Sequence, residues 1–98
     1  MHVIAFSTIR EYIAGHADSD SALRDWYNKT DEASWNDFSD VRQTFGSADF
    51  VGNDRYVFNI KGNAYRLVAM IFFQVHLVYV RWIGTHAEYD RIKDIEKL

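Results

Sequence analysis

The sequence contains neither cysteine nor proline among its 98 residues. Without cysteine the chain can form no disulfide framework and no thiolate metal site, so its folding does not require an oxidising compartment. Without proline, the boundaries of its helices and strands must be marked by glycine and by capping residues. These absences exclude a disulfide-stabilised secreted scaffold and favour an ordinary packed core.

Long apolar runs are also missing. The longest are of strand length, and Arg66 and Gln74 bracket one of them, so no segment is expected to span a bilayer. Met1 leads directly into strand and helix signals, without the charged leader, apolar stretch and small-residue cleavage site of a secretory signal. We therefore expect a cytoplasmic protein with no membrane association.

Hydrophobic residues make up 48% of the chain and aromatic residues 16%, which is enough to close one core, so we expect a single domain over residues 1–98. The net charge of −3 argues against general nucleic-acid binding. The charge is unevenly distributed, however. Residues 1–54 hold four Lys/Arg and ten Asp/Glu, whereas residues 55–98 hold seven Lys/Arg and four Asp/Glu. Such a chain can present one acidic surface and one basic surface.

The first half has the apolar spacing of helices, and its aromatic residues are interpreted as core. The expected elements are a strand at residues 2–6, a helix opened by a capping box of Thr8 and Glu11, a helix over residues 21–30, and a helix that starts with Ser34 and Asp37 as cap and ends at Gly46.

The second half alternates with the period of strands from Asp49 onward, which predicts a three-stranded antiparallel meander over residues 55–83. If the strands pair without a bulge, one face packs on the helices and the other brings Lys61, Arg66 and Arg81 together. In that register Trp82 lies on the packed face and Ile83 on the open one. The fold class is therefore α+β, with an antiparallel sheet packed against N-terminal helices.

Thr85 and Glu88 form a further capping box, which predicts a short C-terminal helix with His86 at its first position. Tyr89, Asp90 and Lys93 follow within two turns. The positive end of the helix dipole favours a neutral imidazole, which can act as a base or as a stacking partner. Together with the arginines, these residues supply what RNA cleavage needs, namely a base, an acid, cations for the phosphate and a platform for a base.

Simpler interpretations of the same residues remain open. Exposed strand arginines also serve as solvated charges that prevent edge pairing, and a histidine at a helix start is often an ordinary surface residue. Lys61 also suits a turn, and Tyr89 can be a half-buried aromatic with one hydrogen-bond partner. The remaining histidines are scattered without ligand spacing, so no metal site is expected.

The segments Y-V-F-N-I-K-G-N-A-Y-R-L, at residues 56–67, and V-Y-V-R-W-I-G-T-H-A-E-Y-D, at residues 78–90, resemble the HigB toxins of the RelE-like superfamily of bacterial mRNA interferases. The resemblance is closest over residues 55–91 and collinear before them. It implies a RelE-like domain that acts as the toxin of a type II toxin–antitoxin system and cleaves translated mRNA in the ribosomal A site. The acidic overall balance departs from the family pattern.

The resemblance also implies roles for particular residues. Arg66, Arg81, His86 and Tyr89 correspond to catalytic positions, while RNA binding falls to the cations Lys61, Arg66, Arg81 and Lys93. No metal or organic cofactor is implied. The implied partners are mRNA, the ribosome and a HigA-like helix-turn-helix antitoxin, through which alone operator DNA would be bound. The competing hypothesis is a non-catalytic module that binds RNA or protein with its open sheet face.

Overall fold

A five-stranded sheet runs through the centre of the molecule in the order β1-β5-β4-β3-β2. The computed structural model describes residues 1–98. The strands are β1 (His2–Ile4), β2 (Asp49–Gly52), β3 (Arg55–Ile60), β4 (Tyr65–Phe72) and β5 (Leu77–Thr85). β1 pairs parallel with β5, and the other neighbours are antiparallel. The predicted α+β class and the meander are confirmed, although β1 makes the sheet mixed rather than wholly antiparallel.

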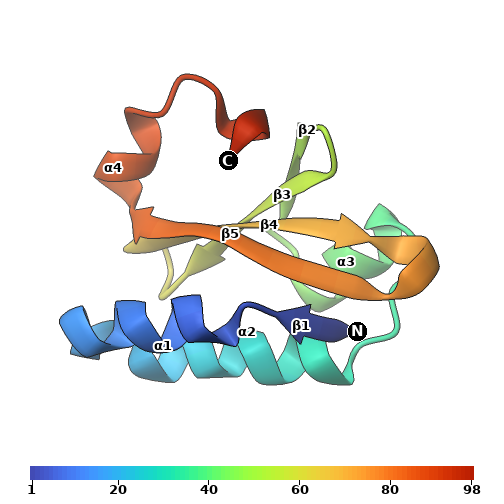
Figure 1. The fold of residues 1–98 in the computed structure, drawn as a ribbon, viewed down its shortest axis with the longest axis horizontal. Coiled ribbons are helices and arrows are strands. Elements are labelled where there is room, and N and C mark those ends of the chain that lie inside the picture. The colour runs from blue at the N-terminus through green and yellow to red at the C-terminus, as the bar shows by residue number, and fades with distance from the viewer.

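The helices divide between the two faces of this sheet (Figure 1). α1 and α2 cover one face, and the C-terminal segment with α4 lies over the other. The helical elements are α1 (Phe6–Gly15), η1 (Ala17–Ser19), α2 (Asp20–Glu32), α3 (Phe38–Thr44), η2 (Phe73–Val75), α4 (His86–Asp90) and η3 (Ile95–Lys97). None of the helices has the length and apolar character needed to cross a membrane.

The core lies between the sheet and the layer formed by α1 and α2. It is built from alternate residues of β3, β4 and β5, as the period-two pattern predicts. Phe58 and Leu67 are almost completely buried, and the Phe58 ring centroid lies 5.4 Å from that of Trp26 on α2. Full burial of one such side chain contributes about 1.5–3 kcal/mol to stability. This packing makes the sheet a rigid support for whatever its other face carries.

Two predicted helix starts differ from those observed. α1 begins at Phe6, preceded by Ala5 in the left-handed conformation with φ 67°, so Thr8 and Glu11 lie inside the helix and form no capping box. α3 is capped by Asp37, which accepts a hydrogen bond from the Asp40 amide at 3.0 Å, and not by Ser34. Each pattern allowed more than one start, and the path of the chain from the preceding strand or loop selects between them.

A β-bulge in β5 changes which side chains reach the open face. Val68 of β4 pairs with Trp82, whereas the next residue, Ala69, pairs with Val80, so Arg81 is an extra residue in the ladder. Beyond the bulge the alternation is inverted. Trp82 therefore lies on the open face, and Ile83 packs against the core. The predicted faces of these two residues were wrong because the prediction assumed uninterrupted pairing.

Candidate functional site

Arg66 stands at the centre of the open face. It belongs to the central strand β4, where it pairs with Asn59 of β3 and Gly84 of β5. Its guanidinium carbon lies 6.0 Å from the centroid of the Tyr89 ring, at the limit of a cation–π contact. Its one hydrogen bond is a long one, 3.5 Å from Nη1 to the Tyr65 carbonyl oxygen. Most of its donors are thus free for a ligand.

An aromatic wall formed by Trp82 and Tyr89 stands beside this arginine. The centroids of the two rings are 6.1 Å apart, with an interplanar angle of 52°. The Trp82 indole lies over Gly84, where a Cβ atom would come within 2.4 Å of indole Cη2. Only glycine at this position leaves room for the ring. The wall offers apolar ring surface on which a nucleobase can stack.

The helix α4 supplies Tyr89 and His86, and the predicted capping box fixes its start. The Thr85 Oγ1 atom accepts a hydrogen bond from the Glu88 amide at 3.1 Å, and the Glu88 carboxylate accepts one from the Thr85 amide at 2.7 Å. The latter bond lowers the pKa of Glu88 below its usual range. The capping box gives hydrogen-bond acceptors to two backbone amides at the helix start and so orients the first turn of α4.

His86 is oriented by a carboxylate on its own helix. Its Nδ1 lies 2.8 Å from Asp90 Oδ2, one turn along α4. Nδ1 is thereby engaged by Asp90, and Nε2 is the ring nitrogen that has no hydrogen-bond partner in the protein. The helix dipole was expected to be the main influence on this ring, but α4 is five residues long and Asp90 is nearer. No hydrogen bond joins His86 to Arg66 or Arg81.

Tyr89 is in its protonated form at neutral pH. Burial raises the pKa of its phenol above the ordinary value of 10.0, Asp49 and Asp90 add to the increase, and Arg66 opposes it. A phenol in this state can donate a hydrogen bond or a proton but is a poor base. The raised pKa of the phenol therefore suits Tyr89 to donate a proton, whereas the contact with Asp90 orients the His86 ring and leaves its Nε2 available.

Arg81 points to a different part of the open face. Its guanidinium carbon lies 4.9 Å from the Tyr79 ring centroid, and its Nε donates to the backbone oxygen of Leu98 at 3.0 Å. Arg55 binds the same oxygen. None of Arg55, Arg66 and Arg81 is ion-paired with an Asp or Glu side chain, since the four ion pairs between side chains involve other residues.

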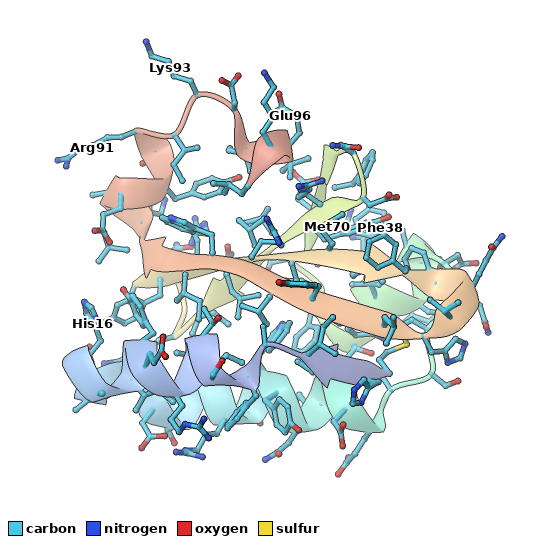
Figure 2. The ribbon with its side chains drawn as sticks, in the orientation of Figure 1. His16, Phe38, Met70, Arg91, Lys93 and Glu96 are labelled. Atoms are coloured by element: carbon cyan, nitrogen blue, oxygen red, sulfur yellow. The ribbon has the colours of Figure 1, made fainter.

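The two lysines that were predicted to bind RNA, Lys61 and Lys93, do not lie with the arginines. Lys61 lies in the turn after β3, and its Nζ is 3.1 Å from Asp18 Oδ2 in the helical layer. Tyr65 donates to the other oxygen of Asp18 at 2.7 Å, which lowers the pKa of Asp18 and raises that of Tyr65 to about 12. Lys93 follows α4, and its side chain points away from the sheet (Figure 2).

Neither Arg55 nor Trp82 was predicted from the sequence to lie at the site. Trp82 was missed because a bulge leaves no clear mark on the sequence. Arg55 follows the Asn53-Asp54 turn and was interpreted only as part of the strand alternation. It could have been found, because Arg66 pairs with Asn59, and Arg55 lies an even number of residues before Asn59 and so on the same face.

A surface concavity lies elsewhere, on the helical layer. Its lining holds three carboxylates, Asp18, Asp20 and Asp25, and one cation, Arg24, which pairs with Asp20. Carboxylates repel phosphate, so this concavity does not suit a nucleic acid. The open sheet face, although it is not a deep cleft, carries the unpaired cations and remains the candidate site.

The mixed sheet, the helices on one face and the cationic, aromatic opposite face define a small α+β domain of the RelE-like class. Sequence comparison takes the assignment further. The model of the HigB toxin family, described as the RelE-like toxic component of a toxin-antitoxin system, matches residues 19–92. The chain belongs to the HigB toxin family.

Individual relatives carry names consistent with this family. The chain is 54% identical over 35 residues to the mRNA interferase toxin HigB of Escherichia coli strain K12, a match that covers 36% of the chain and 34% of that protein. It is 29% identical over 94 residues to the mRNA interferase HigB of Escherichia coli O6:H1, covering 94% of the chain and 91% of that protein. The chain thus spans about a third of the length of the K12 relative in that match.

Proposed function

We propose that the chain is the toxin of a type II toxin–antitoxin system and acts as a metal-independent endoribonuclease on mRNA in the ribosomal A site. The observation that supports this most is the unpaired Arg66 guanidinium beside the wall of Trp82 and Tyr89, with His86 on the same short helix as Tyr89. Charge for a phosphate and rings for a base occur together there. The names of the relatives support the same reaction.

In the proposed reaction the 2′-hydroxyl of a ribose attacks the adjacent phosphorus, and the bond from phosphorus to the 5′-oxygen breaks. Nε2 of His86 accepts the proton of the 2′-hydroxyl, with Asp90 holding the ring through Nδ1. Arg66 stabilises the charge that develops on the phosphate. Tyr89, whose raised pKa keeps the phenol protonated at neutral pH, gives its phenolic proton to the departing 5′-oxygen. The products carry a 2′,3′-cyclic phosphate and a 5′-hydroxyl.

Dependence on the ribosome is proposed on electrostatic grounds. At a net charge of −3, and with Lys61 paired to Asp18, the chain offers few contacts to the phosphates of free RNA. A ribosome that holds the message in place supplies the missing binding energy and places the activity in the bacterial cytoplasm. A helix-turn-helix antitoxin would silence the toxin by covering Arg66 and Arg81 or by excluding it from the A site, and operator DNA would be reached through that antitoxin.

The test is to induce the protein in bacteria and to map new 5′ ends on translated mRNAs. The wild-type chain should generate cuts within reading frames, and Arg66→Ala should reduce them by about 10²–10³-fold because one preorganised charge contact to the reacting phosphate is lost. Arg24→Ala is the matched control, since Arg24 pairs with Asp20 on the far helical layer. New 5′ ends that persist in Arg66→Ala at equal expression would remove this residue from the site.

A second measurement compares purified toxin on translating ribosomes and on naked mRNA at about 0.15 M salt, where weak phosphate contacts are screened. Cleavage should be far faster on ribosomes. Efficient cutting of naked mRNA would contradict ribosome dependence while leaving the nuclease in place. Binding of RNA without any new 5′ end in either assay would instead support the non-catalytic module.

A further inference from the structure

The segment formed by residues 91–98, here called the C-terminal strap, crosses the open face of the sheet. It leaves α4 and passes over the face opposite α1 and α2, as Figure 1 shows. Its last turn, η3, contacts β2. The Asn53 side chain donates to the Glu96 carbonyl oxygen at 3.2 Å. The strap therefore lies over part of the surface proposed to receive RNA.

The strap ends between two guanidinium groups. Arg55 donates to the Leu98 backbone oxygen from Nε at 3.0 Å and from Nη2 at 2.7 Å, and Arg81 donates to the same oxygen from Nε at 3.0 Å. Arg55 is 9% exposed and also donates from Nη1 to the Asn53 carbonyl oxygen. Its planar group is thus fixed by contacts on three sides.

Two converging guanidinium groups repel each other unless an anion binds between them. Here both donate to a carboxyl oxygen of Leu98, the last of the 98 residues, which supplies the negative charge in the RNA-free protein. The planar fork of arginine fits the oxygens of a phosphate as well as those of a carboxylate, so a phosphodiester can replace the Leu98 carboxyl group between the two arginines. Arg66 pairs with Gly84 of β5, and Arg81 precedes Gly84 by three positions, which is about 10 Å along a strand. A single RNA strand that lies along β5 could therefore contact both Arg66 and the pair of Arg55 and Arg81.

We propose that Arg55 and Arg81 form a second phosphate site, separate from Arg66, which binds the RNA backbone and which the C-terminal strap occupies in the RNA-free protein. This proposal rests on the proposed function, since it assumes an RNA substrate. RNA and strap compete for the same donors, so the strap leaves when RNA binds. Arg55 contacts the substrate without touching the reacting atoms.

The strap is attached loosely enough to be displaced. Its polar attachments to the sheet are the contacts to Leu98 and Glu96 described above, and its apolar residues Ile92, Ile95 and Leu98 are only partly buried. Segments with few buried contacts open at a small fraction of the global unfolding free energy. Partial burial of these residues is enough to hold the strap down when no RNA is present.

A reversible lock tests this competition. The position of a Cβ atom on Gly52 lies 3.6 Å from Glu96 Cβ, within the range that a disulfide spans, and the chain has no cysteine of its own. The variant carries Gly52→Cys with Glu96→Cys. Gly52 has φ 101°, so the new side chain is strained. That strain is present in the oxidised and the reduced protein alike, so comparing the two isolates the lock.

The probe is a short fluorescent RNA with 2′-O-methyl groups, which keeps the phosphates but cannot be cut. The oxidised protein should bind it about tenfold more weakly than the reduced protein, because two charge-assisted contacts stay blocked. Glu96→Cys alone, under the same treatment, controls for the oxidant. A methylphosphonate version of the probe, which lacks the charge, should show no difference between the two states.

Deletion of residues 95–98 gives an independent arm if the lock disturbs folding. The shortened chain should bind the probe about tenfold more tightly, and Arg55→Gln in the shortened chain should reverse the gain. In the shortened chain, Arg55→Gln should also make the plot of log K against log salt concentration less steep by about 0.7, the value for one single-strand phosphate contact. Arg24→Gln is the matched control and should change neither quantity.

Equal affinities of the oxidised and reduced proteins would overturn the proposal, as would Arg55→Gln having no effect once the strap is removed. If the lock instead impeded only binding of an acidic antitoxin, the site would serve a protein carboxylate and the RNA assignment would be wrong. Failure of the proposed function is seen separately. If the protein binds the probe through Arg55 but yields no new 5′ ends on ribosomes, the phosphate site is supported and the proposed nuclease activity is wrong.

Discussion

Gly84→Ala is the sharpest test of how the aromatic wall is built. The added methyl carbon would lie 2.4 Å from Cη2 and 2.5 Å from Cζ2 of the Trp82 indole. Ordinary carbon contacts are about 3.5–4.0 Å, so the ring must move by about 1 Å or more. Overpacking of this kind costs about 1–3 kcal/mol in the free energy of unfolding, out of a typical total of 5–15 kcal/mol.

The measurement is urea unfolding followed by far-UV circular dichroism, because tryptophan fluorescence would report the ring movement itself. The expected loss corresponds to a fall in Tm of roughly 4–8 °C per kcal/mol for a domain of this size. Cleavage of mRNA on ribosomes should fall as well, since a displaced Trp82 no longer supports Tyr89.

A double-mutant cycle identifies the cause. In the Trp82→Leu background the added methyl group meets no indole, and its remaining close neighbour is Glu88 Oε1 at 3.1 Å, which can give way by a few tenths of an ångström. Gly84→Ala should then cost much less than in the wild-type background, because alanine also restricts the unfolded chain more than glycine does. An equal loss of stability in both would refute the argument that the collision with Trp82 is what excludes alanine.

Three further predictions concern the surroundings of the site. The pKa of Asp18 is lower in the folded protein, so this residue stabilises the fold above its unfolded pKa, and the stabilisation is lost as the pH falls through its folded pKa. Asp18→Asn should therefore abolish this acid-dependent loss in unfolding scans between neutral and acid pH. Thr85→Ala removes the cap of α4 and should cost about 0.5–2 kcal/mol in urea unfolding, with cleavage reduced because α4 holds His86 and Tyr89, the proposed proton carriers. His86→Ala should lower ribosome-dependent cleavage more than Tyr89→Phe, because the phenylalanine retains the ring for stacking. If both variants were as active as the wild type, the chemistry would lie elsewhere on the sheet.

Much of the fold could be predicted from local pattern. Core residues at every second position mark β3, β4 and most of β5, and the capping box at Thr85 marks the start of α4, because both patterns are consequences of spacing alone. The parallel pairing of β1 with β5 could not be read in this way, since it joins segments at opposite ends of the chain. Nor could the left-handed Ala5, because nothing local favours that conformation for alanine over the later helix start.

The site was partly predictable for the same physical reason. Arg66 could be placed on the open face because β4 pairs regularly on its β3 side. Lys61 could not be excluded from that face, because the carboxylate that holds it, Asp18, lies 43 residues earlier in the chain. Arg55 could not be connected with Leu98, again 43 residues away, without the path of the strap. Contacts between distant segments are what single-sequence patterns do not encode.

The parallel pairing of β1 also bears on the order in which the molecule assembles. His2 pairs with Leu77, so β1 cannot join the sheet until a strand that begins 75 residues later in the chain has been synthesised. Closing a loop of that length is a non-local step, and such steps slow folding more than hairpin formation does. The meander from β2 to β5 can form as successive hairpins while the N-terminal strand is still unpaired. β1 is therefore expected to be the last strand to join the sheet, so that β5, which carries Arg81 and Trp82, keeps an open edge until β1 pairs with it.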